Sequence, residues 1–516
     1  MKRSLIVLWF VSAMFLCDGA NAAGNIGGIP IQHHGRIKPF SAFAQETLQF
    51  VSGKSNWHRQ DASVFFLADL EHPHIFLDLP LILVDHPGLK QLLQLRPEVN
   101  NFSYQQIKPA FHTLEVLVQA AAQKREKDER LSVLEQQAEV VYQRVTTVQH
   151  LGTGELITVI PVTEGAWLSP YKVSGLKSVE FKKLATDCAA KLPTLDQSVA
   201  QWQKEVEPLL AKGMSVKLRM ETAYYMFQPF YYTGIFYFLG FVSLLLAKPF
   251  AQGLGMFLVM AGFTAHTNGI LLRWLILERP PVANMYETII FMDWVLMLMV
   301  GIFVVIKNRQ SLLSSGAFVS ALGMLYARLL PMDQSLDILS PVLRSSYWLM
   351  VQEIMIISSY SLFAFAMAVA HRHLFLSVRG KMTPQEDQLS AHTIDRLLQA
   401  GQIALVAGTI LGGVLANEAC GRFWGLNPKE TWAVITFLGY MTVLHLRYSK
   451  KLNNFALAAG AILGFLLVVM SWYGMNFVLG RGMHSYGPGS GGLQWIVCFL
   501  VFEACFLGFV FFKRKM

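Results

Sequence analysis

Apolar residues are unevenly distributed along this chain, and the pattern changes near residue 222. Residues 24–220 mix apolar and polar positions as soluble proteins do, whereas residues 225–512 contain long apolar windows. Each window approaches the roughly 20 residues that a helix needs to cross a bilayer. We place nine of them, at 225–247, 251–275, 287–306, 313–330, 347–370, 398–416, 431–447, 453–475 and 491–512. The pattern predicts an all-α polytopic membrane protein with about nine transmembrane helices, preceded by a mainly helical extracytoplasmic domain.

Within the first part, apolar residues recur at three- and four-residue spacing over 104–147 and again over 194–222. This period predicts amphipathic helices. A short apolar run from Leu156 to Val162, bounded by glycines and a proline, could be a strand, and residues 31–40 are typical of a loop. We find no nucleophile–base pair and no phosphate-binding loop here. We therefore interpret this part as a docking or spacer domain.

The N-terminus is typical of an exported protein. Two basic residues precede an apolar run from Leu5 to Leu16, and Ala20 and Ala22 form a small-residue cleavage pattern. These features predict a signal peptide over residues 1–22. The resulting division is a signal peptide at 1–22, a periplasmic domain at 23–222 and a transmembrane domain at 223–516. An uncleaved anchor is the alternative, and it places the next segment on the same side of the membrane.

Composition and charge support a membrane protein. The chain has 516 residues, of which 53% are hydrophobic and only 15% charged, and its net charge is +9. The basic residues punctuate apolar windows instead of forming a polar face, which argues against a nucleic-acid partner. With the N-terminal domain outside, the inner loops carry thirteen Lys and Arg residues and the outer loops seven. This bias predicts a multi-pass protein of the bacterial inner membrane with a cytoplasmic C-terminus.

The cysteines exclude several classes of protein. The chain has no C-x-x-C pair, which disfavours a thioredoxin-like protein, a zinc site and a covalently bound c-type haem. Cys498 and Cys505 lie in an apolar window, and we expect them to be packing residues.

The unusual chemistry lies in three predicted outer segments, near residues 273–287, 415–432 and 480–487. The middle segment places Arg422, Lys429 and Glu430 among Trp424 and Trp432. A flat aromatic surface edged by cations, with an imidazole nearby at His484, suits a planar, anionic, iron-containing ligand. Haem matches this description, because its ring stacks, its propionates bind Arg or Lys and its iron binds His.

Several segments resemble the CcsA (ResC) family, the haem-handling subunit with a tryptophan-rich WWD domain in the system II cytochrome c synthase. The resemblance covers about 255–515. It is carried by residues 281–287 (PVANMYE), 341–349 (PVLRSSYWL), 424–432 (WGLNPKETW), 444–447 (LHLR) and 483–487 (MHSYG). Residues 35–39 (GRIKP) resemble a stretch that precedes the CcsA part in some fused synthases.

The resemblance implies a function in cytochrome c biogenesis as a subunit of a cytochrome c synthase (haem lyase). Haem b would be bound at the outer face and presented to the C-x-x-C-H thiols of apocytochrome c, with a separate ResB/CcsB-like membrane chain as partner. His484 matches the second outer histidine of the family, and His445 matches its intramembrane histidine; these two are the candidate iron ligands. We expect Trp424, Trp432, Arg422, Lys429 and His266 to complete the haem-binding set, although His266 is equally compatible with a structural role.

The sequence also departs from the family pattern. Gln352 stands where the first outer histidine is expected, and an amide is a poor iron ligand beside imidazole. Leu415 and Leu426 stand where the family usually has Trp, and Asn427 replaces its Asp. A second ligand could instead come from another histidine, the iron could be held by His484 alone, or haem handling could be lost. The candidates for that other histidine are His33, His34 and His266.

Two other functions compete with a haem-binding synthase subunit. A non-catalytic scaffold or assembly subunit with weakened haem binding is favoured by the substituted positions. A small-molecule transporter would place its polar groups at the middle of the membrane, whereas this sequence concentrates them in the predicted outer loops.

Overall fold

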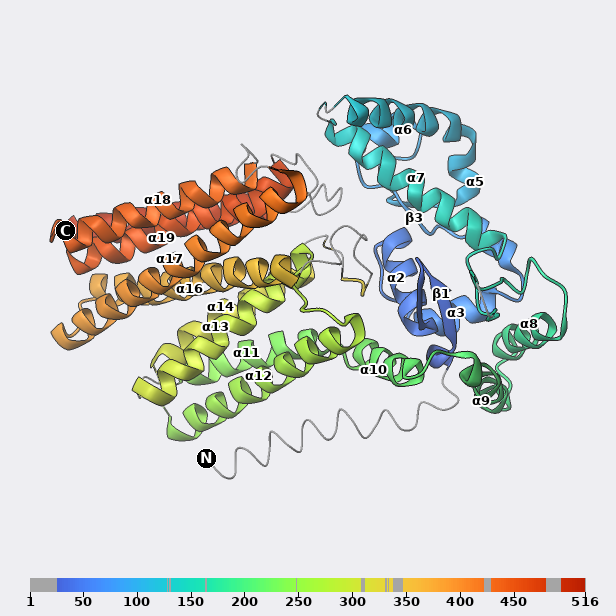
Figure 1. Ribbon diagram of the computed structural model, residues 1–516, viewed down its shortest axis with the longest axis horizontal. Coiled ribbons are helices and arrows are strands. Elements are labelled where there is room, and N and C mark those ends of the chain that lie inside the picture. The colour runs from blue at the N-terminus through green and yellow to red at the C-terminus, as the bar shows by residue number, and fades with distance from the viewer. Residues whose placement is uncertain are drawn as a thin grey trace. The chain divides into compact units, whose positions relative to one another are not determined.

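The computed structural model describes residues 26–127, 129, 131–162, 165–246, 248–307, 311–329, 332, 334–336, 347–421, 428–478 and 493–515 (Figure 1). The chain divides into two compact units. The first comprises Met1–Phe227 with Ser335–Ile338, and the second comprises Gln228–Gln334 with Leu339–Met516. The signal peptide predicted at 1–22 lies outside the described residues.

The first unit is mainly helical and has its own apolar core. Phe43, Phe66 and Phe76 are fully buried in that core. Its longer helices are α2 (Phe40–Ser52), α3 (Ala62–Asp69), α6 (Phe111–Glu126), α7 (Val133–Gly152), α8 (Leu176–Ala189), α9 (Leu195–Val206) and α10 (Met214–Phe227). Its shorter elements are η2 (Ile26–Gly28), η3 (Pro73–Leu77), α4 (Pro87–Leu92), α5 (Tyr104–Ile107), η4 (Lys108–Ala110) and η5 (Glu207–Leu209). Two short antiparallel pairs complete it: β1 (Pro30–His33) with β2 (Arg36–Pro39), and β3 (Ile82–Leu83) with β4 (Asn101–Phe102).

The sequence-based interpretation of residues 31–40 as a loop is wrong, because this stretch forms the β1–β2 hairpin. His33 pairs with Arg36, and the two-residue turn between them has φ values of 49° at His34 and 75° at Gly35. Positive φ at both central residues matches the right-handed twist of a hairpin. Each strand has only four residues, so its alternation is too short to stand out in the sequence.

The strand considered for residues 156–162 does not form. The run makes one isolated bridge, between Ile160 and Leu168. The Thr158 carbonyl accepts from the Gln32 backbone N–H of β1, and the Thr158 hydroxyl donates to the Gln32 carbonyl. In contrast, the amphipathic helices predicted over 104–147 and 194–222 are confirmed as α6 with α7 and as α9 with α10.

The second unit is a bundle of long helices (Figure 1). They are α11 (Pro229–Leu245), α12 (Pro249–Leu277), α13 (Met285–Lys307), α14 (Ser311–Leu329), α16 (Tyr347–Val378), α17 (Pro384–Cys420), α18 (Pro428–Tyr448), α19 (Asn454–Val469) and α20 (Leu493–Lys515). A π-helical turn, η6 (Met470–Val478), continues α19. Helix α11 packs on α12 and α14, and α13 packs against both α14 and α16. Helix α16 packs along α17 and α19.

Local sequence sets the ends of the longest helix. The Thr383 side chain accepts a hydrogen bond from the Glu386 backbone N–H, and Pro384 occupies the first position of α17. Both features are typical of a helix start. At the other end Gly421 adopts a left-handed conformation with φ of 67°, which closes the last turn without steric cost. Helix α18 begins at Pro428, so the two helices include both ends of the segment 415–432. Residues 422–427 lie outside the described residues, and the tryptophan-rich outer loop stays a prediction.

Among the described residues, seven helices are long and apolar enough to span a membrane, and all lie in the second unit. Each of the nine windows overlaps a helix, but α11 has only 17 residues and α18 is not among the seven. The chain is thus a helical multi-pass membrane protein, and the number nine stays a prediction. The packing role expected for Cys498 and Cys505 is wrong, because both lie exposed on α20.

Candidate functional site

Of the seven predicted haem-binding residues, three lie on α18, His266 lies on α12, and the other three fall outside the described residues. These last three are Arg422, Trp424 and His484. Lys429 and Trp432 lie in the first two turns of α18, where both are partly buried. Of the tryptophan-rich segment, the structure thus describes Lys429 and Trp432 at the start of α18.

Gln352, which replaces the expected outer histidine, lies on α16 against α17. A Cβ atom added to Gly412 of α17 would come within 2.5 Å of the Gln352 amide nitrogen Nε2. Gly412 thus leaves the space that the amide occupies. The side chain at this position packs into the α16–α17 contact, and the volume around it is limited.

His445 lines a groove at the other end of α18. The groove has a volume of about 440 Å³ and combines apolar and polar side chains of two helices, α17 and α18. Its lining residues are Asp395, Gln399, Met441, Leu444, His445, Arg447 and Tyr448. The His445 side chain is exposed to this groove.

The hydrogen bond of His445 defines its tautomer. Its Nδ1 lies 2.9 Å from the Met441 carbonyl oxygen. A carbonyl oxygen only accepts, so Nδ1 carries the proton and the neutral ring keeps its lone pair on Nε2. Such a backbone hydrogen bond is the usual way in which a protein orients a histidine that ligates a metal. His445 therefore presents a ligand nitrogen toward open space.

A second groove of about 170 Å³ follows the same helix pair nearer to the start of α18. It is lined by Val406, Thr409, Ile410, Ala433, Val434 and Phe437. Between the two grooves, the Gln402 amide donates to the Phe437 carbonyl at 2.8 Å and joins the helices. The α17–α18 surface is thus hollowed on both sides of this contact.

His266 lies in a different part of the second unit and is fully buried on α12. Its Nε2 is 2.8 Å from the Ile290 carbonyl oxygen, so this nitrogen donates, and its Nδ1 accepts from the Tyr237 hydroxyl at 3.2 Å. Both ring nitrogens are therefore engaged, and the structure favours the structural role considered for this residue over iron ligation.

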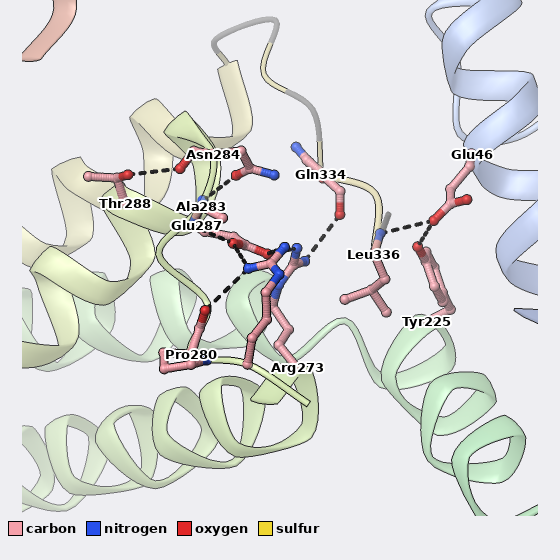
Figure 2. A network of polar contacts seen from close by, with 11 residues as sticks. Glu46, Tyr225, Arg273, Pro280, Ala283, Asn284, Glu287, Thr288, Gln334 and Leu336 are labelled. Carbon is pink, nitrogen blue, oxygen red and sulfur yellow. Dashed lines mark hydrogen bonds and ion pairs between the residues drawn. The ribbon is translucent and has the colours of Figure 1, made fainter. Parts of the chain in front are cut away.

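Glu287 is the centre of a buried ionic network that the sequence-based interpretation missed (Figure 2). Its carboxylate accepts from the Arg273 guanidinium at 2.8 Å, from Arg279 at 2.7 Å and from the Ala283 backbone N–H at 2.9 Å. Arg273 also donates to the Gln334 carbonyl at 3.1 Å. The arginines flank the turn between α12 and α13, so the carboxylate fixes this turn. The sequence analysis singled out residues 273–287, but separations of 8 and 14 residues from Glu287 gave no local signal of the ion pairs.

The first unit holds another polar network, around β2, α2 and α10. Arg36 donates to Glu221 through two nitrogens at 2.6 and 2.8 Å. Burial raises the pKa of the Glu221 carboxyl although the Arg36 guanidinium opposes this shift. Glu46 accepts from the Tyr225 hydroxyl and from the Leu336 backbone N–H (Figure 2). Burial, with the charge of Glu46, raises the pKa of Tyr225.

Histidines 33 and 34 stack on each other at the β1–β2 turn, with ring centroids 3.9 Å apart. They belong to the first unit, whereas His445 belongs to the second. Among the described residues no group of three or more His, Cys, Asp or Glu side chains is arranged to hold a metal ion.

These features define a multi-pass helical membrane protein with a histidine-bearing groove along one helix pair. A family model described as Cytochrome C assembly protein matches residues 282–484. CcsA, the cytochrome c biogenesis protein of Synechococcus sp. (strain CC9605), is 32% identical over 48% of this chain and 95% of its own length. CcsA of Morus indica is 30% identical over 44% of this chain and 84% of its own length. The chain belongs to the CcsA-type family of cytochrome c biogenesis proteins.

A longer relative extends the similarity beyond the membrane part. Protein NrfI of Wolinella succinogenes is 28% identical over 88% of this chain and 53% of its own length. The chain thus spans about half the length of NrfI, and the match includes most of the first unit.

Proposed function

We propose that this protein binds haem b as a substrate and presents it for covalent attachment to apocytochrome c. Membership of the CcsA-type family supports a place in cytochrome c biogenesis. The observation that carries the haem-binding part is the orientation of His445, whose free Nε2 faces a groove of about 440 Å³. Iron binds a neutral imidazole nitrogen, so this residue offers the bond that haem requires.

The rest of the groove suits the other parts of haem. Met441 and Leu444 supply apolar contacts for the ring, and Arg447 brings a positive charge for a propionate. The Arg447 guanidinium is itself held by the Leu452 carbonyl at 3.0 Å and by the Asn454 side chain at 2.8 Å. Its position is therefore fixed before a ligand arrives, which reduces the entropic cost of binding.

Helix α18 begins within the tryptophan-rich segment and carries the groove around His445 near its other end. We propose that His445 receives haem near the cytoplasmic side and that His484, Trp424, Trp432, Arg422 and Lys429 hold it at the periplasmic side. A ResB/CcsB-like membrane chain would cover the groove, because α17 and α18 expose apolar residues beside it. We propose that the protein lies in the bacterial inner membrane, with the first unit in the periplasm.

The attachment chemistry requires positioning and no oxidant. In each thioether, a thiol of the C-x-x-C-H segment adds across a vinyl double bond of haem; the sulfur bonds to one carbon and the hydrogen to the other. The residues of this chain would hold the ring so that the vinyl groups meet the thiols, which is catalysis by proximity and orientation. We therefore propose a role as a haem lyase subunit.

A haem spectrum of the purified full chain tests this function. Protein from haem-replete bacterial cells should carry b-type haem, and His445→Ala and His484→Ala should each lose most of it. His392→Ala is the matched control, because His392 is exposed on α17 and lies outside the groove. A colourless wild-type protein, alone and with a ResB-like chain, would refute the proposal.

A non-catalytic scaffold is the second candidate function, and the position of Gln352 favours it. The amide packs against Gly412 where the family pattern has an imidazole. Gln352→His should increase haem retention if the site is otherwise intact, whereas Gln352→Ala should not. Equal haem content in all three proteins, at a low level, would favour the scaffold.

A further inference from the structure

A second polar site lies inside the second unit, in the four helices α11–α14 and away from α17 and α18. It contains a carboxyl group, Asp293, on α13. This side chain is 1% exposed and lies within the candidate membrane span Met285–Ile306. An ionisable group at such a position is costly and therefore a candidate for function.

The neighbouring helix leaves a space for the Asp293 carboxyl. A Cβ atom at Gly323 of α14 would lie only 2.0 Å from Asp293 Oδ2. One turn before Gly323, the Ser320 hydroxyl is also fully buried, and residues three apart share a helix face. Among the described residues, neither Asp293 Oδ2 nor Ser320 Oγ has a hydrogen-bond partner. Two buried polar groups thus lie on two helices that pack together, α13 and α14, and neither of these atoms has a partner among the described residues.

The other wall of this site is the Tyr237–His266 pair. The Tyr237 hydroxyl donates to His266 Nδ1, and His266 Nε2 donates to the Ile290 carbonyl. Ile290 lies three residues before Asp293, so this hydrogen-bonded chain reaches α13 one turn from the carboxyl. Asp293 is also an electrostatic neighbour of the Tyr237 hydroxyl.

The charge state of Asp293 follows from its surroundings. Among the described residues it makes no ion pair, whereas the buried carboxyl of Glu287 on the same helix pairs with two arginines. An ionised carboxyl without a counter-charge costs several kcal/mol in a low-dielectric interior. Such a group takes up a proton instead.

We propose that Asp293, together with Ser320, Tyr237 and His266, forms an intramembrane proton-binding site. The carboxyl holds the proton, Gly323 provides the space around it, and the Tyr237–His266 pair supplies the polar wall next to it. The ligand of this site is a proton, and the site is independent of haem binding at α17–α18. A monovalent cation bound by the same oxygens would be a different site.

Labelling with dicyclohexylcarbodiimide tests the proposal, since this reagent modifies protonated carboxyls in apolar surroundings. The full chain in membranes should be labelled at Asp293 at neutral pH, as read by mass spectrometry of peptides. Glu287 serves as the internal control, because its two arginine partners keep it ionised and unlabelled. Labelling of Glu287 with Asp293 unlabelled would overturn the proposal.

Infrared spectroscopy gives a second readout that does not depend on reagent access. The carbonyl band of a protonated carboxyl should be present in the wild-type protein and lost in Asp293→Asn, while Glu503→Gln keeps it. Absence of that band from the wild-type protein would show that Asp293 carries no proton, and it would refute the proposal. If sodium chloride, but not choline chloride, blocks labelling at constant pH, the site binds a cation and the proposal is wrong.

Discussion

At the scale of single residues, the clearest structural determinant is the carboxylate of Glu287. It is fully buried and pairs with two guanidinium groups, one of which, Arg273, is also fully buried. A buried ion pair is weak evidence for net stability, but removal of one partner leaves a charge without compensation. The network therefore makes the α12–α13 turn sensitive to a change of one side chain.

We expect Glu287→Gln to destabilise the protein strongly, by about 3–5 kcal/mol, because it leaves two cations without their counter-charge. Thermal unfolding of the full chain in detergent, compared with wild type, measures the effect. Glu386→Gln is the control: this glutamate pairs with Arg372 at 3.4 Å on a partly exposed surface, where an ion pair contributes at most about 1 kcal/mol. Equal melting temperatures for the two variants would contradict the prediction.

At the scale of elements, the start of α7 shows how sequence determines a helix end. Ser132 and Glu135 form a capping box, in which each side chain accepts from the backbone N–H of the other. Lys124 donates to the same glutamate at 2.7 Å. The hydrogen bonds from Lys124 and from the Ser132 backbone hold the pKa of Glu135 below its usual 4.5.

This shift predicts a pH dependence. A carboxyl with a lowered pKa in the folded state stabilises the fold above pH 4.5 and loses that contribution as the pH falls through the folded-state pKa. The protection of α7 amides from hydrogen exchange should therefore fall in acid. Glu135→Gln should show a flatter dependence over the same window, and Ser132→Ala should cost about 1 kcal/mol. Glu180→Gln, a change at an exposed position on α8, should keep the pH dependence of the wild-type protein. A flatter pH dependence of α7 protection in that variant would contradict the role assigned to Glu135.

The elements also show which structures a sequence reveals. Helices with a sustained apolar period, such as α6, α7 and α9, were predictable because burial of one face requires that period. The ends of α16 and α17 were not, since both helices continue past their apolar windows into polar turns. The β1–β2 hairpin escaped notice because its positive-φ turn uses histidine and glycine instead of the commoner asparagine and glycine.

The candidate site was predictable only in part. The type and order of its residues, including His445 and Trp432, followed from local motifs. The groove around His445 did not, because Asp395 and Gln399 come from α17 and reach it only through helix packing. The buried position of Asp293 could not be predicted for the same reason, because the space around its carboxyl depends on Gly323 in the next helix. The apolar period of a helix shows which of its faces is buried, but it does not show which residues of another helix that face contacts.

At the scale of the whole molecule, orientation in the membrane decides which side each proposed step uses. The charge bias of the loops predicts that the first unit lies outside and that the turn between α16 and α17 lies inside. Lys183 on α8 and Lys381 in that turn are both exposed, so each can report on its side of the membrane.

We expect a membrane-impermeant maleimide to label Lys183→Cys in bacterial cells with a permeabilised outer membrane and to label Lys381→Cys only after the inner membrane is opened. The reporters are placed singly in a chain whose native cysteines are replaced by serine, and that chain without a reporter gives the background. Because an inner loop with several basic residues is costly to move across the bilayer, both reporters should give the stated pattern in every molecule. Labelling of Lys381→Cys in cells with an intact inner membrane would show that the protein has the opposite orientation. Haem movement from His445 toward the tryptophan-rich segment would then run in the opposite direction across the membrane.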